Sequence, residues 1–252
     1  MTRTKWSPKL PASIIKVKIL VLLLIAVPAF AEVLQSSELS DQDVIEILNQ
    51  PMKNRVSRIN ERPEIRTRLV VFAFDRHKSL STRWNSLTTL GAVSAKAYRW
   101  EIEKGLKSRD WFMRNAGLLA VMHDERARAV LWSRKMLQDP ALVVRSQAVK
   151  NLMQLRAAES REDVWKGLYS SSNFRGGHGL WIRNSMAEAL ALWARPVDEK
   201  RFLKMLMESD RGIQKWAIRG LERSTGQRLT SPTEVISVQR QKWLAKLSQE
   251  QI

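Results

Sequence analysis

Apolar residues recur at helical spacing in a short segment that is repeated along the chain. In one copy these residues are Val144, Ala148, Leu152 and Leu155. In another copy they are Ile182, Met186, Leu190 and Trp193. Steps of four, four and three residues place each set on one face of a helix. The pattern therefore predicts at least two helices that bury equivalent faces.

Each copy of this segment opens with a cation. The five cations, which we call the ladder, are Arg83, Arg114, Arg145, Arg183 and Lys215. The intervals between them are 31, 31, 38 and 32 residues. Self-similarity at this period is typical of stacked helical repeats. We therefore expect an all-α protein, an α-solenoid of about five helical hairpins.

A second periodic feature precedes each ladder cation and predicts the other helix of each hairpin. Aromatic residues recur there at Trp100, Trp132, Trp165 and Phe202, which we call the aromatic column, and tryptophans at such repeat-equivalent positions are expected to lie in the core. Each is followed within six residues by a leucine, namely Leu106, Leu137, Leu168 or Leu206. Polar turn residues separate the two helices, as in Asp139-Pro140, where Pro suits the first position of a helix. Neither helix alone can bury its apolar face, so the hairpins must stack.

The run Asp-Pro-x-x-Val-Val-Arg-Ser-x-Ala-Val-x-x-Leu from Asp139 to Leu152 resembles the HEAT-like repeat family. The tail segment 220–227, Gly-Leu-Glu-Arg-Ser-Thr-Gly-Gln, followed by Trp243-Leu244, is similar to the ending of bacterial HEAT-repeat proteins. The resemblance covers roughly residues 60 to 247. Two copies depart from it, because Thr82 and Gln214 stand where the family has an apolar residue before the cation.

The ladder has two interpretations. The family resemblance implies that the recurring Arg ties adjacent repeats together through acidic or carbonyl groups. Alternatively, five cations spaced one repeat apart could track a polyanion, because regularly spaced charge releases counterions on binding. Both interpretations predict the same residues.

The N-terminus has the pattern of a secretory signal peptide in residues 1–31. Its charged residues are all basic, namely Arg3, Lys5, Lys9, Lys16 and Lys18. An apolar run, 19–27, and an Ala-x-Ala sequence ending at Ala31 follow, which predicts cleavage after Ala31. The alternative is an uncleaved membrane anchor, but the run is well short of the ~20 residues that span a bilayer. We expect a periplasmic or secreted bacterial protein; the absence of Cys excludes disulfides and a lipoprotein.

The charge balance favours an anionic partner. The chain carries a net charge of +18, and removing the five leader cations leaves +13. For an exported protein the accessible anions are wall polymers, lipid headgroups and acidic proteins. Export argues against nucleic acid as a partner, although HEAT-like DNA glycosylases exist and would be the alternative if the leader stays uncleaved.

The rest of the chain divides simply. Residues 32–60 form a polar lead-in, in which Ser40 and Asp43 cap a short helix that ends near Pro51. Residues 61–252 form the solenoid, beginning with a helix after Pro63. A closing helix that contains Trp243 is expected to cap its C-terminal end.

Candidate chemistry is sparse. The imidazoles are His77, His123 and His178, and no nucleophile motif, phosphate loop or His-Glu pair occurs. His123-Asp124-Glu125 falls between predicted helices and is expected to be a solvated turn rather than a ligand set. We predict a protein without catalytic residues, metal or cofactor.

The third ladder interval is seven residues longer than the one before it and six longer than the one after it, and the extra residues fall in 170–179. Insertions into repeats form loops that commonly carry recognition, although a tolerated insertion without a role gives the same pattern. The candidate binding residues are Phe174, Arg175, His178 and Trp181. Trp111 is a weaker candidate, since it also lies beside a turn.

These features predict a scaffold of the bacterial envelope that binds a protein partner through a basic surface on the second helices of its hairpins. One alternative is a binder of an anionic polymer or membrane surface, whose affinity salt would weaken steeply. The other is the nucleic-acid-binding protein of the glycosylase type.

Overall fold

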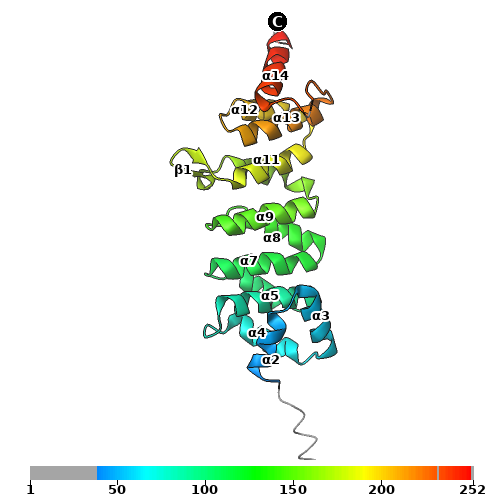
Figure 1. Ribbon diagram of the computed structural model, residues 1–252, viewed down its shortest axis with the longest axis vertical. Coiled ribbons are helices and arrows are strands. Elements are labelled where there is room, and N and C mark those ends of the chain that lie inside the picture. The colour runs from blue at the N-terminus through cyan, green and yellow to red at the C-terminus, as the bar shows by residue number, and fades with distance from the viewer. Residues whose placement is uncertain (1–38, 232, 251–252) are drawn as a thin grey trace, which may run out of the picture. The chain divides into compact units, whose positions relative to one another are not determined.

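The computed structural model describes residues 39–231 and 233–250 and confirms the predicted all-α class. Figure 1 shows helices throughout these residues, with one short pair of strands. The chain divides into the units Met1–Val44 and Ile45–Ile252, and the packing discussed below lies within the second. The predicted signal peptide, residues 1–31, lies outside the described residues.

The lead-in contains two described helices where the sequence predicted one. α2 (Asp41–Leu48) begins with the expected capping box, in which the Ser40 amide donates to Asp43 and the Asp43 amide donates to the Ser40 hydroxyl. α3 (Met52–Glu61) was not predicted because its sequence is polar and Ile59 is its buried residue. Polar contacts position it instead, since Arg55 Nη1 donates to Asn85 Oδ1 at 2.9 Å.

Five pairs of consecutive helices follow among the described residues, as the repeat period predicted. The first helices of the pairs are α4 (Ile65–Phe74), α6 (Arg99–Leu106), α8 (Arg126–Met136), α10 (Arg161–Leu168) and α12 (Glu199–Leu206). The second helices are α5 (Leu80–Ser94), α7 (Trp111–Ala120), α9 (Leu142–Gln154), α11 (Ile182–Leu192) and α13 (Arg211–Thr225). Within each pair the two helices pack against each other.

The second helices also pack against one another in chain order. α5 contacts α7, α7 contacts α9, α9 contacts α11 and α11 contacts α13 (Figure 1). Short 3-10 turns precede or follow several helices: η1 (Val121–His123), η2 (Ala158–Ser160), η3 (Ser171–Asn173) and η4 (Pro196–Asp198). This order of packing is compatible with the predicted α-solenoid.

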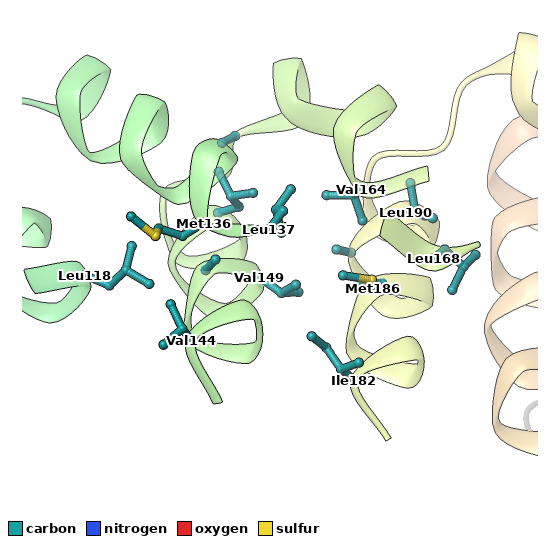
Figure 2. Close-up of a cluster of buried hydrophobic side chains, with 14 of the residues drawn as sticks. Leu118, Met136, Leu137, Val144, Val149, Val164, Leu168, Ile182, Met186 and Leu190 are labelled. Carbon is teal, nitrogen blue, oxygen red and sulfur yellow. The ribbon is translucent and has the colours of Figure 1, made fainter. Parts of the chain in front are cut away.

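The core is continuous across neighbouring pairs. Figure 2 shows apolar side chains from α7 to α11 converging between the helices, among them Leu118, Val149 and Met186. The predicted leucine column is buried throughout: Leu106 (1%), Leu137 (3%), Leu168 (0%) and Leu206 (0%) are the exposed fractions. Such shared burial stabilises stacked repeats, because no pair can bury its own apolar faces completely.

The predicted aromatic column is correct for three of its four members. Trp132, Trp165 and Phe202 are buried, but Trp100 is 67% exposed. Ile102, two residues further along α6, is the side chain that enters the core, with 1% exposure. The error arose because the four aromatic residues were assigned the same helix face, whereas Trp100 lies on the outer face of α6.

α14 (Ile236–Glu250) packs against α13, as predicted for the closing helix. Trp243 is 1% exposed, and Arg240 Nε donates to the Leu206 carbonyl at 3.0 Å. Among the described residues, no helix is both long enough and apolar enough to cross a membrane.

Candidate functional site

The ladder arginines lock neighbouring helix pairs together. The clearest case is Arg114 of α7, which donates from Nε and Nη2 to the two oxygens of Asp139, at 2.6 and 2.8 Å. Its Nη1 donates to the carbonyls of Ser108 and Arg109. The Asp139 side chain is 3% exposed, so this is a buried bidentate ion pair between adjacent pairs of helices. The Asp139 contact raises the pKa of Arg114.

Arg145 makes the same kind of lock with a neutral partner. Its Nε donates to Asn173 Oδ1 at 2.9 Å, and its Nη1 donates to the Asp139 carbonyl at 2.7 Å. Asn173 is fully buried and donates in turn to the Gly167 carbonyl at 2.7 Å. Asn173, which lies in the inserted segment 170–179, therefore helps to hold Arg145 in place.

Arg183 and Arg83 make the remaining contacts of the ladder arginines, and they differ in how many of their donors find a partner. Arg183 donates to Glu208 at 2.7 Å and to the Leu168 carbonyl at 3.0 Å. Arg83 donates to Asp110 at 3.1 Å, but its buried Nε has no hydrogen-bond partner. Because these arginines are buried or paired, the ladder is structural and does not form the basic surface that the sequence suggested.

Lys215 is not a member of the ladder. Its side chain is exposed, whereas Gln214 donates from Nε2 to the Glu208 carbonyl at 2.6 Å. Arg114 and Arg145 also reach the carbonyl six residues before them. Gln214 therefore occupies the ladder position, and the last interval becomes 31 residues instead of 32. The sequence pattern favoured Lys215 because it weighted charge above register.

The predicted binding insertion folds into a small hairpin. Strands β1 (Phe174–Arg175) and β2 (His178–Gly179) pair antiparallel, with Arg175 opposite His178. Gly176 and Gly177 make the turn at φ values of 56° and 79°, which favour glycine. Figure 1 shows this hairpin projecting beside α11. Arg175 and His178 are exposed together at its tip.

The other two predicted residues of this site face different surroundings. The Phe174 ring lies 4.4 Å from the Arg183 guanidinium and is partly buried, so it supports the fold. Trp181 is 54% exposed, and Trp111 is 51% exposed at the start of α7. The structure therefore leaves Arg175, His178 and Trp181 accessible.

Exposed lysines form a regular series on the first helices, and the sequence pattern alone did not identify this series. We call Lys104, Lys135, Lys166 and Lys204 the lysine row. Their intervals of 31, 31 and 38 residues match those of the first four ladder residues. Each lies near the C-terminal end of its helix, where a cation also interacts favourably with the helix dipole. The equal intervals were visible in the sequence, but surface lysines are common and gain meaning only when the helix faces are known.

Glu103 and Glu162, two carboxylates on the same helices, pair with cations other than those of the lysine row. Glu103 pairs with Arg128 at 2.9 Å, and Glu162 pairs with Arg201 at 2.8 Å. The contact with Lys107, and then that with Arg128, lowers the pKa of Glu103, and the contact with Arg201 lowers the pKa of Glu162. Within the described part of the chain, no lysine of the row forms an ion pair. The row therefore keeps its full charge available to a partner.

Acid should weaken one of these pairs and with it the fold. Arg99 donates to both oxygens of Asp124, whose side chain is 1% exposed, and this contact lowers the pKa of Asp124. Because the pKa of Asp124 is lower in the folded state, the ion pair contributes its full stability above the unfolded-state pKa of about 3.9. This stability is lost as the pH falls through the folded-state pKa. We expect Asp124→Asn to flatten the loss of stability below about pH 4, measured by urea unfolding at several pH values. An unchanged slope would contradict this role.

Each helix of the lysine row also has one large exposed apolar side chain three or four residues from its lysine, inside α6 and α8 and at the residue directly after α10 and α12. These side chains are Trp100 (67%), Leu131 (48%), Tyr169 (39%) and Met207 (64%), with the exposed fraction in parentheses. Residues three or four apart are neighbours on a helix surface. The lysine row therefore alternates with apolar contact points. Burial raises the pKa of Tyr169, so its phenol stays neutral and serves as an apolar surface with a polar tip.

Two clefts lie along the same face, at the two ends of the lysine row. The larger, about 1010 Å³, is lined by Phe74, Trp100, Lys104 and Lys107, with Arg76, Arg83 and Arg109 around them. The smaller, about 380 Å³, is lined by Glu162, Trp165, Lys166, Tyr169, Arg201 and Lys204. Cations lie over the aromatic rings in both, as Lys104 does over Phe74 at 4.1 Å and Lys204 over Tyr169 at 5.6 Å.

The histidines do not gather with other potential ligands. His123 ends η1 and is exposed, as Glu125 is, but the predicted turn is not solvated throughout, because the Asp124 side chain is 1% exposed and pairs with Arg99 and Arg128. No group of three or more His, Cys, Asp or Glu side chains in the described ranges could hold a metal ion.

The fold and this face define an all-α protein of stacked helix pairs with a basic, partly apolar outer surface. No family model matches the chain, and no curated protein matches it. One solved structure with some likeness is the crystal structure of an engineered protein, with 17% sequence identity and a TM-score of 0.46. The match covers 77% of this chain and 94% of the engineered one.

Proposed function

We propose that this protein is a non-enzymatic scaffold, a HEAT-like repeat protein that binds an acidic protein partner through the outer face of its first helices. One observation carries the proposal: each of α6, α8, α10 and α12 carries a lysine without an ion pair, and an exposed apolar side chain lies three or four residues from it, in the helix or directly after its end. The lysine row replaces the second helices as the proposed basic surface.

The mixture of charge and apolar area favours a protein over a uniform polyanion. Protein interfaces concentrate binding energy in aromatic and aliphatic anchors, while rim charges steer the approach of the partner. Trp100, Leu131 and Met207 would supply such anchors here. An anionic polymer or lipid surface could engage the same lysines, and it remains the second candidate because the row is continuous over four helices.

Matched charge reversals test the proposal. The full chain and a variant with Lys104, Lys135, Lys166 and Lys204 changed to Glu are used to capture proteins from an envelope extract, at about 0.1 M and 1 M salt. A control variant changes Lys53, Lys96, Lys150 and Lys215 to Glu, exposed lysines outside the row, so the net charge is equal.

A partner captured by the wild type and the control, but lost with the row variant, is the expected result. We expect its capture to persist in part at 1 M salt, because the apolar anchors are not screened. Equal loss with both variants would show that overall charge binds, and would favour the polymer. Retention by the row variant would contradict the proposed surface.

Export to the bacterial envelope is part of the proposal and is supported by the leader pattern of residues 1–31. After expression in a bacterium, the protein is expected to begin at Glu32, as determined by intact mass. Ala31→Asp should block cleavage, because the processing site requires a small residue. An unprocessed wild-type chain would contradict export and strengthen the nucleic-acid alternative.

A further inference from the structure

The cleft of about 1010 Å³ around Trp100 differs from the rest of the lysine row in having both an exposed indole and a buried cation. Trp100 is 67% exposed, whereas Arg83, which also lines the cleft, is 8% exposed. We call this space, with the lining residues given above, the Trp100 cleft. Its volume is at the upper end of the range of small-molecule sites.

Arg83 is the least satisfied arginine of the ladder. In the described residues its guanidinium donates to Asp110 alone, at 3.1 Å, and its buried Nε has no partner. Arg114 at the equivalent position has two carboxylate oxygens and two carbonyls. A buried guanidinium with unmet hydrogen bonds is costly and is stabilised by an additional anion.

The remaining lining residues indicate which anion fits. Arg76, Lys104, Lys107 and Arg109 place four further cations around the cleft, all of them exposed. Glu103 and Asp110 add carboxylates, with side chains 34% and 45% exposed, that can accept hydrogen bonds from hydroxyl groups. Both carboxylates already pair with cations, but each keeps lone pairs that can accept from hydroxyl groups, so the lining suits a ligand that carries both anionic groups and hydroxyls.

We propose that the Trp100 cleft binds an acidic oligosaccharide. Its carboxylate or phosphate groups would contact the cations of the cleft, its hydroxyls would donate to Glu103 and Asp110, and one sugar face would stack on Trp100. Lys104 lies 5.0 Å from one side of the indole, and the exposure of Trp100 leaves area for the sugar. This inference goes beyond the proposed partner, although the two sites share Lys104 and Trp100.

Calorimetric titration of the purified full chain tests the inference without any protein partner. The probes are tetragalacturonate, which carries carboxylates, glucose 6-phosphate, which carries a phosphate, and maltotetraose, which is neutral. We expect at least one acidic probe to bind at least tenfold more tightly than maltotetraose. Trp100→Ala and Arg76→Ala are each expected to weaken that binding at least tenfold.

Two controls separate this site from general charge or aromatic effects. Trp111→Ala removes another exposed indole, and Lys166→Ala removes a lysine of the row outside the cleft; both should bind the acidic probe within twofold of the wild type. Circular dichroism checks that every variant is folded. Equal binding of neutral and acidic probes, no binding, or equal weakening by Lys166→Ala would overturn the inference. Such failure would leave the protein-partner proposal standing, because that proposal is tested by capture with the row variants.

Discussion

Replacing Arg114 with alanine is expected to lower the free energy of unfolding by about 3–5 kcal/mol, because it leaves the buried carboxylate of Asp139 without its cation. The two groups form a bidentate pair between adjacent helix pairs, and the exposed fractions of their side chains are 13% and 3%. Two carbonyls in the turn before α7 also lose their donor. Chemical denaturation followed by circular dichroism measures the loss.

Lys215→Ala is the informative control for this variant. The sequence pattern placed Lys215 in the same ladder, but its side chain is exposed, so its removal should change stability by less than about 0.5 kcal/mol. A small effect of Arg114→Ala, similar to that of Lys215→Ala, would contradict the structural role of the ladder.

Gly91→Ala is expected to destabilise the protein by about 1–3 kcal/mol, although alanine is the better helix former. Gly91 lies in α5 where α7 approaches, and an added Cβ would lie 2.5 Å from the Ala120 Cα and 2.8 Å from its carbonyl oxygen. These are backbone atoms, so the contact is relieved only by separating the two helices. The midpoint and slope of urea unfolding should report the loss.

Gly167→Ala supplies a matched control in another buried helical position. Its Cβ would meet the end of the flexible Met186 side chain, at 2.9 Å from Cε, which can move aside. The two variants make the same chemical change, so a clearly larger loss for Gly91→Ala isolates the backbone contact. Equal effects would show that the spacing of α5 and α7 is not fixed by Gly91.

Periodic features of the sequence predicted most of the fold. The leucine column and four ladder arginines recur with the repeat because each copy has the same packing to satisfy, and all of them are in the expected helices except Leu137, which directly follows α8. The register of Lys215 and the burial of Trp100 were wrong, because one copy alone does not define a helix face. α3 was missed because Arg55 anchors it through hydrogen bonds, which leave no apolar stripe.

The candidate site was harder to predict than the fold. The ladder cations could be recognised in the sequence, but only the structure shows that the four arginines donate hydrogen bonds to Asp110, Asp139, Asn173 and Glu208. The lysine row has the same intervals, yet its significance depends on which carboxylates are already paired, and pairing between helices is not encoded in local sequence. The hairpin tip at Arg175 and His178 was predicted as a loop and is exposed, as expected of an insertion.

Site-specific photo-crosslinking tests most directly which face binds the partner. A benzoylphenylalanine is placed at Leu131 on the first helix α8 or at Val143 on the second helix α9, positions that are each 48% exposed. With the captured partner present, we predict a crosslinked adduct from position 131 and none from position 143. An adduct from position 143 alone, or equal adducts from both positions, would contradict the assignment of the binding surface to the first helices.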